Sequence, residues 1–295
     1  MHRSIESLLA DARESGRPLP QVVLDAEVRE TGVAADVIRA RVRRTLAVMR
    51  DAIREGLEGE VHSPSGLTGG RARRLAQDGP RLLGPRVTDV LARAIATLEV
   101  NAAMGLIVAA PTAGAAGVLP AVLISAGEFL DVHDDDRLVD AMLVAGGVGG
   151  VVAQRASLCG AEGGCQAETG TAAAMGAAAV AWLGGGSLDQ VATAVALALQ
   201  GMLGLICDPI GGLVEVPCIY RNASAAMQAI TAAEMALAGL DFPVPADEVI
   251  DVMGEIGRRI PAAYRETAQG GLAATPAARK LVQIQPSKQP TGISG

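Results

Sequence analysis

Cysteine is the residue type in this sequence with the clearest capacity for chemistry. Four cysteines occur: Cys159 and Cys165 in a glycine-rich segment, and Cys207 and Cys218 in a segment rich in glycine and proline. The amides of such turns can donate hydrogen bonds to thiolates or to cluster sulfides. No pair has the short spacing of zinc ribbons or ferredoxins. Spacing alone therefore leaves two interpretations open, a metal site or thiols that are buried and inert.

Lysine bears on a second type of cofactor. The chain has only Lys280 and Lys288, both near its C-terminal end. A pyridoxal-phosphate enzyme needs a Schiff-base lysine seated in its active site. The sequence also lacks a phosphate-binding Gly-Lys-Ser/Thr loop, a Gly-x-Ser-x-Gly elbow and a His-Glu-x-x-His motif. We therefore expect no pyridoxal phosphate and none of the chemistry that these motifs support.

The charge of the chain limits its partners and its location. The net charge of -7 has the wrong sign for binding phosphates or an anionic membrane surface. Glu6 and Asp11 interrupt the region in which a signal peptide needs an apolar stretch. We expect a cytoplasmic protein that binds neither nucleic acid nor a membrane. In that reducing compartment, cysteines serve more often as ligands, catalytic groups or buried thiols than as disulfides.

Two long stretches without charge, residues 101–127 and 169–188, require a choice between a membrane and a protein core. Half of the residues are hydrophobic but only 2% are aromatic. Pro111 and Pro120 break the first stretch, and alanine and glycine, which dominate the second, contribute little to membrane insertion. We therefore predict that both stretches form buried helices of a large core.

The elements that must position the cysteines are predicted to be helices. Apolar residues recur at three- and four-residue steps along residues 5–56, which predicts one long amphipathic helix there, and Arg39, Arg41, Arg43 and Arg44 are interpreted as its solvated face. Further helical segments are expected at the ranges 88–104, 138–144 and 249–260. Asp134, Asp135 and Asp136 precede the second of these and are interpreted as a helix N-terminus rather than a cation site.

No alternation of apolar and polar residues persists long enough to predict a sheet. The sequence thus favours a mainly α-helical, Ala/Gly-rich single domain over residues 1–282, with a disordered tail over residues 283–295. Within the domain, residues 62–70 and 109–114 are loops of glycines and hydroxyl residues, which either turn the chain or bind something. His62 adjoins the first loop and is an obvious general-base candidate, but no base is assigned.

Several motifs together resemble one enzyme family. They occur in order along nearly the whole chain, at Ser65–Gly70, Glu99–Gly105, Pro111–Gly114, Gly163–Glu168, Cys207–Pro209, Val214–Cys218, Arg221–Ala223, Arg265–Thr267 and Gly270–Pro276. In these motifs the sequence resembles the alpha chain of bacterial iron–sulfur L-serine dehydratases, which convert L-serine into pyruvate and ammonia.

The resemblance implies that Cys165, Cys207 and Cys218 hold a 4Fe-4S cluster. Three thiolates leave one iron without a cysteine, and that iron can act as a Lewis acid on the hydroxyl group that serine loses. The Gly/Pro loops are then expected to form the cluster and substrate site. The substrate-binding residues that the resemblance suggests come from two loops and one helix end, and are Ser65, Thr68, Gly69, Gly70, Asn101, Thr112 and Gly114.

Cys159 departs from the family pattern, which has another residue just before the Gly-Ala-Glu-Gly-Gly-Cys turn. As a permanent ligand Cys159 would close the Lewis-acid site, and as a transient ligand it would protect the resting cluster. We expect a bystander thiol, because a catalytic iron must stay accessible. Two other functions remain open at this point: a related lyase acting on cysteine or threonine, and a non-catalytic iron–sulfur or zinc protein.

The resemblance also bears on assembly. The chain matches only the cluster-binding part of longer single-chain family members. A separate beta subunit is therefore expected, and the chain is expected to act on L-serine as part of a homo- or hetero-oligomer.

Overall fold

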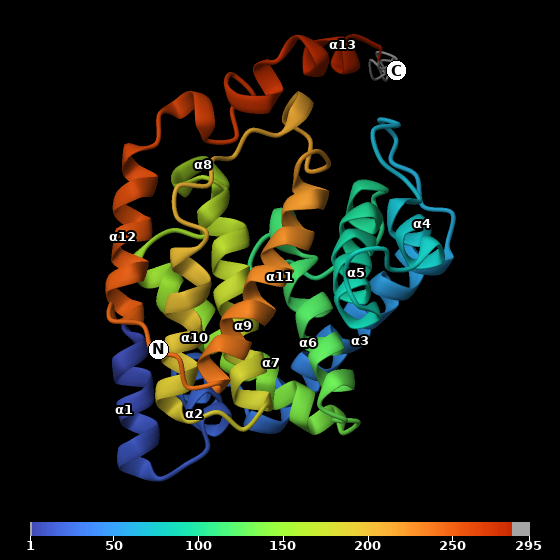
Figure 1. Cartoon of the computed structure of the whole chain (residues 1–295). Helices are drawn as coiled ribbons and strands as arrows, with labels where there is room; N and C mark the ends of the chain where they lie inside the picture. The colour runs from blue at the N-terminus through green and yellow to red at the C-terminus, as the bar shows by residue number, and fades with distance from the viewer. Residues whose placement is uncertain (1, 285–295) are drawn as a thin grey trace, which may run out of the picture.

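The computed structural model describes residues 2–284 and confirms the mainly α-helical fold (Figure 1). That part of the chain contains no β-strand. Its α-helices are α1 (Ile5–Ser15), α2 (Leu19–Thr31), α3 (Ala35–Glu58), α4 (Arg71–Asp78), α5 (Pro85–Ala102), α6 (Val118–Phe129), α7 (Asp135–Arg155), α8 (Gly160–Gly163), α9 (Thr171–Leu183), α10 (Leu188–Gln200), α11 (Cys218–Leu237), α12 (Ala246–Arg259) and α13 (Pro276–Ile284). The tail predicted at 283–295 lies outside the described residues, except that Gln283 and Ile284 end α13.

The single long helix predicted at residues 5–56 is wrong, because this region forms α1, α2 and α3. Gly16 and Gly32 adopt the left-handed conformation, with φ of 65° and 70°, and cap the first two helices. Pro18 then precedes α2, and a proline there starts a helix more easily than it continues one. The apolar period is similar on both sides of each break, so periodicity alone joined three helices into one.

Helix α9 lies at the centre of the molecule and packs against α6, α7, α10 and α11 (Figure 1). Nearly all of its side chains are buried, and most of them are alanine. Small side chains let neighbouring helices approach closely, which explains how so few aromatic residues fill this core. The second uncharged stretch therefore lies largely in the core helix α9, whereas the prediction for the first is wrong in part, because residues 103–117 connect α5 to α6 without an α-helix and Met104 and Leu106 are exposed. Within the described residues, no helix is long and apolar enough to cross a membrane.

The start of α7 confirms one interpretation of the aspartates and corrects another. The Asp134 side chain accepts a hydrogen bond from the Asp136 amide, as an N-cap does. The predicted solvated face of arginines is wrong in part. Arg39 pairs with Asp136 and Asp140 at 3.2 and 2.5 Å, and Arg43 also pairs with Asp136, so these arginines join α3 to α7.

The other helix predictions hold within a few residues. The segment predicted at 88–104 is α5, which starts earlier because Pro85 occupies its first turn. The apolar run at 138–144 lies inside α7, and α12 ends just before Pro261. The loops that carry the sequence motifs meet at one end of the bundle, where α8, the start of α11 and α13 also lie (top of Figure 1). This loop end holds the candidate site.

Candidate active site

Three of the four cysteines are buried and lie on different elements at the loop end. Cys165 begins the π-helical turn η2 (Gln166–Gly170), Cys207 lies between α10 and α11, and Cys218 is the first residue of α11. Their exposed fractions are 3%, 4% and 7%, whereas Cys159 is exposed. The Cys207 thiol hydrogen-bonds to Cys165. The structure thus separates Cys159 from the three cysteines of the predicted ligand set.

The surroundings of the three thiols favour different protonation states. The hydrogen bond from Cys207 lowers the pKa of Cys165, and the Thr169 hydroxyl and the Arg221 charge act in the same direction. The same hydrogen bond and burial raise the pKa of Cys207, and burial raises the pKa of Cys218 to about 12. Metal binding requires thiolates, so loading this site must release protons from the other two cysteines.

Glu168 lies beside this thiol pair and was not predicted as a site residue. Its Oε1 atom accepts a hydrogen bond of 2.6 Å from the Thr112 hydroxyl, and its Oε2 atom lies 3.8 Å from Cys207 Sγ. Burial raises the pKa of this carboxyl. A Cβ atom at Gly114 or Gly160 would stand 2.9 or 2.4 Å from its oxygens. Glycine at these two positions therefore leaves the space that the carboxylate occupies.

The loop of residues 62–70, here called the hydroxyl loop, is held by two further buried carboxylates. The Thr68 hydroxyl donates to Glu99 at 2.9 Å, and Glu99 also accepts the amides of Arg71 and Ala72 at the start of α4. The Ser65 hydroxyl lies 2.8 and 2.7 Å from the two carboxylate oxygens of Glu215. Glu99 and Glu215 are 0% and 5% exposed. These contacts fix the loop from two directions.

The hydroxyls that were predicted to bind substrate thus share one arrangement. Ser65, Thr68 and Thr112 each donate to a buried glutamate that lies far away in the sequence. A hydroxyl that donates its proton to a carboxylate keeps lone pairs for accepting. Such hydroxyls suit the ammonium group of an amino acid better than its carboxylate.

Asn222 joins the second loop to the cysteines. Its side-chain amide donates to the carbonyl oxygens of Gly114 and Cys218 at 2.7 and 2.8 Å, and its Oδ1 atom accepts from the Gly117 amide. Asn222 is fully buried, so these bonds satisfy a polar side chain that water does not reach. The predicted residue Gly114 and the predicted ligand Cys218 are therefore linked through one side chain.

The segment of residues 207–218, here called the cysteine loop, also holds the C-terminal part of the chain. Asp208 is 1% exposed, pairs with Arg221 at 2.7 Å and accepts the Leu272 amide at 2.6 Å. The Cys207 amide donates to the Tyr264 carbonyl, and the Cys207 carbonyl accepts from the Glu266 amide at 2.7 Å. These bonds explain why the motifs near residues 265 and 270 belong to the same site.

The remaining predicted residues are placed less directly. Gly69 and Gly70 have φ of 157° and 68°, and Gly70 precedes α4, so their positions serve the loop conformation. Asn101 lies in the last turn of α5, and its side chain makes no hydrogen bond within residues 2–284. The exposed His62 forms a β-bridge with Gly69. Within the described residues, its side chain makes no hydrogen bond to the thiols.

Sequence reasoning missed the polar side chains that hold the site together. Glu99, Glu168, Glu215 and Asn222 all lie inside the motifs that carry the family resemblance. The available signal was an acidic or amide residue among small or apolar residues, where burial would need a partner. The partners themselves come from distant segments, so the sequence did not identify them.

The donor set fits an iron–sulfur cluster by its chemistry. In the described chain, no group of three His, Cys, Asp or Glu side chains is gathered closely enough to hold a metal ion. A single ion needs its ligands packed around one point, whereas a cluster spreads its thiolates around a larger body. Three buried thiols on separate segments, near the Arg221 charge, are donors of the type that iron–sulfur clusters use.

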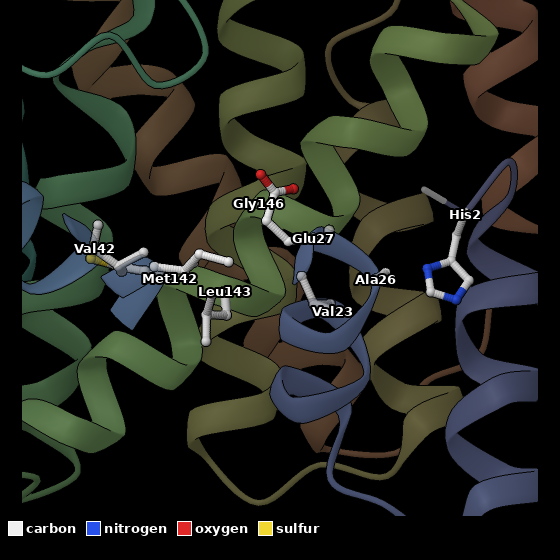
Figure 2. Close-up of a pocket in the computed structure, with 10 residues that line it drawn as sticks. His2, Val23, Ala26, Glu27, Val42, Met142, Leu143 and Gly146 are labelled. Atoms are coloured by element: carbon white, nitrogen blue, oxygen red, sulfur yellow. The ribbon is translucent and has the colours of Figure 1, made fainter. Parts of the chain in front are cut away.

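A separate cavity lies among α2, α3 and α7 (Figure 2). Its volume is about 240 Å³, and its walls are mainly apolar, with Val42, Met142 and Leu143 among them. His2 and Glu27 are the polar side chains that line it. None of the cysteines or predicted substrate residues contributes to this cavity, so it is distinct from the candidate active site.

Comparison with known proteins agrees with the motifs. Residues 14–273 match the family model described as serine dehydratase alpha chain. The probable L-serine dehydratase alpha chain of Bacillus subtilis is 46% identical over 95% of this chain and 94% of its own length. The L-serine dehydratase alpha chain of Peptoniphilus asaccharolyticus is 37% identical over 95% and 97%. The L-serine dehydratase of Streptomyces coelicolor is 41% identical over 92% of this chain but only 60% of its own length.

Proposed function

Because the chain belongs to the serine dehydratase alpha chain family, we propose that it is the catalytic chain of an L-serine dehydratase, which eliminates water from L-serine and yields pyruvate and ammonia. The observation that carries this function is the family match over residues 14–273, which includes every residue of the candidate site. Its relatives are named for serine, so a lyase specific for cysteine or threonine is not favoured.

We further propose that Cys165, Cys207 and Cys218 hold a 4Fe-4S cluster. Their burial on three separate segments supports this ligand set, and the exposure of Cys159 supports its role as a bystander. When bound, a cluster with three protein thiolates supplies one iron that can act as a Lewis acid on a hydroxyl leaving group. The reducing cytoplasm expected from the sequence suits such a group.

The residues of the chain itself would bind and orient serine beside the thiols. The Thr112 hydroxyl donates its proton to Glu168. Its lone pairs therefore remain available to accept a hydrogen bond from the substrate ammonium group. Gly114 leaves room for the Glu168 carboxylate that holds Thr112, and the hydroxyl loop lies next to the cysteine loop through Ser65 and Glu215. This arrangement orients the substrate and limits its contact with water.

We propose a separate beta chain as the partner. The Streptomyces coelicolor relative is longer than this chain, which covers 60% of it, whereas the alpha chain of Bacillus subtilis is covered over 94% of its length. The Bacillus subtilis relative is named an alpha chain, and that name implies a second type of subunit. The working enzyme is then a hetero-oligomer.

The test is anaerobic purification with iron and sulfide analysis, followed by pyruvate or 2-oxobutyrate formation from serine, threonine and cysteine. The proposal expects about four irons per chain, the cluster count that it assigns, and turnover of serine above the other two. Assays with and without a co-expressed beta chain test the partner. Preference for another amino acid would contradict the proposed substrate, and equal serine turnover without any beta chain would contradict the partner.

A further inference from the structure

We infer that Glu215 is a positioning residue that ties the hydroxyl loop to the cysteine loop through Ser65. The two segments lie 150 residues apart in the chain. Both oxygens of the Glu215 carboxylate lie within 2.8 Å of Ser65 Oγ, and Ser65 Oγ also accepts the Leu67 amide at 3.0 Å. The serine side chain therefore connects the backbone of one loop to a carboxylate of the other.

Burial makes this contact strong. Glu215 is 5% exposed, and a buried carboxylate without a hydrogen-bond donor costs more free energy than most hydrogen bonds supply. Within residues 2–284, the Ser65 hydroxyl is the only group that donates a hydrogen bond to the Glu215 carboxylate. Any movement that separates the loops would leave this carboxylate without a donor.

The main chain of Glu215 connects this contact to Cys218. The Glu215 carbonyl accepts the Ile219 amide at 2.9 Å and is thereby bonded to the first turn of α11, which Cys218 begins. The main chain that carries the Glu215 side chain is therefore held at the start of the helix that carries Cys218. A displacement of Cys218 moves the partner of Ser65, and the reverse holds as well.

The hydroxyl loop is rigid enough to transmit that displacement. The Ser63 amide donates to the Thr68 carbonyl at 3.0 Å, and Thr68 is held by Glu99 on α5. Glu99 fixes the far side of the loop whatever the cysteines do, because α5 carries none of them. Ser65 is thus the part of the loop that responds to the cysteine loop.

The consequence is reciprocal coupling between what the cysteines hold and what the hydroxyl loop binds. This inference rests on the proposed function, because it takes serine as the guest of the loop and a 4Fe-4S cluster as the group held by the thiols. Serine should then slow loss of the cluster, and cluster removal should loosen the hydroxyl loop. Both effects should pass through Ser65 and Glu215.

The experiment compares the wild type with Glu215→Gln, Ser65→Ala and the double variant. Ser65→Thr keeps the hydroxyl and serves as the rescue variant. Ser224→Ala is the matched control, because it removes an exposed hydroxyl of α11 that bonds only to its own helix. Cluster absorbance is followed under a chelator with and without serine, KM and kcat are measured separately, and hydrogen exchange of residues 62–70 is compared before and after cluster removal.

We expect serine to protect the wild-type cluster, and Glu215→Gln and Ser65→Ala to lose most of that protection. KM should rise about tenfold, as when one hydrogen bond to a charged group is lost, with a smaller change in kcat. The double variant should be no worse than the more affected single variant, since both remove the same contact. Ser65→Thr should restore most of the serine protection that Ser65→Ala loses, and Ser224→Ala should behave as the wild type does.

Additive effects, or wild-type protection and KM in both single variants, would overturn the inference. Hydrogen exchange separates this outcome from failure of the proposed function. If the wild type does not turn over serine, the function is wrong. Cluster-dependent exchange at residues 62–70 that disappears in Ser65→Ala would still support the coupling, and cluster-independent exchange would refute it.

Discussion

The loop end of the molecule and the cavity among α2, α3 and α7 are built from opposite kinds of buried atoms. At the loop end, three glutamates are buried, namely Glu99, Glu168 and Glu215. Each accepts a hydrogen bond from a hydroxyl group of another segment. Around the cavity of Figure 2 the walls come from helices and are mostly hydrocarbon. Burying a carboxylate disfavours folding unless its partners are in place, whereas burying hydrocarbon favours it.

This difference suggests that one region mainly sets the arrangement of the active-site loops and the other mainly sets the free energy of unfolding. The buried carboxylates hold loops in one arrangement that hydrocarbon could not specify, so changes there should alter function more than unfolding. The cavity region contributes mainly apolar burial, so changes there should alter unfolding more than function. The predictions below test this division, beginning with the largest expected effect.

Exposure to air and a chelator should abolish activity while leaving the helices intact. The proposed cluster has an iron without a protein thiolate, which oxidants can reach. The Ala-rich core around α9 does not depend on that cluster. Activity and far-UV circular dichroism are measured before and after treatment, and then after anaerobic addition of ferrous iron and thiol, which should restore activity. Full activity after long aerobic chelation would contradict the cluster assignment.

Gly114→Ala should lower kcat/KM by about 100-fold, the scale on which a misplaced group affects an active site. The new Cβ atom would stand 2.9 Å from Glu168 Oε1, so the carboxylate and its partner Thr112 must shift. Steady-state kinetics on the reconstituted enzyme measure the effect, and urea unfolding checks that the fold survives. A variant with normal kinetics would show that the position of Glu168 does not matter.

Leu143→Ala should destabilise the chain by about 2 kcal/mol, the low end of the range for leucine, because the side chain already borders a cavity. Leu143 is 6% exposed and packs with Leu24 and Ile38. Serine turnover by the folded enzyme should stay unchanged. Val252→Ala, at a position 40% exposed on α12, is the control and should change the free energy of unfolding by less than about 0.5 kcal/mol. A large loss of kcat in Leu143→Ala would break the division between the two regions.

Gly146→Ala should stabilise the chain by about 0.5–1 kcal/mol, because alanine is the better helix former and its Cβ atom meets nothing within 4 Å. The neighbouring Gly147→Ala should destabilise it, because its Cβ atom would stand 2.7 Å from Val23 Cγ2. Thermal unfolding of the two variants measures the contrast. Equal melting temperatures would show that the space seen at Gly146 is not available in solution.

The sequence predicted the helical class and the buried Ala-rich helices because both follow from local composition and period. It failed at Gly16 and Gly32, where the same apolar period continues in a new helix with a different direction. Helix direction depends on tertiary packing, which no local pattern contains. The Asp134 cap was predictable because its partner lies two residues away.

The candidate site divides in the same way. The motifs identified the loops and the cysteines by residue type, and burial separates Cys159 from the other three. Ser65, Thr68 and Thr112 each bond to a glutamate between 31 and 150 residues away, and the sequence did not identify these partners. Pairing at that distance is a property of the fold.

Iron and sulfide analysis of four single cysteine variants tests the central claim most directly. Cys165→Ser, Cys207→Ser and Cys218→Ser should each lose the cluster and serine turnover, because each removes one of three thiolates. Cys159→Ser should keep both, because its thiol is exposed and lies outside the buried set. Circular dichroism confirms that every variant folds. Loss of iron in Cys159→Ser, together with full iron in any of the other three, would contradict the ligand assignment and the proposed chemistry that depends on it.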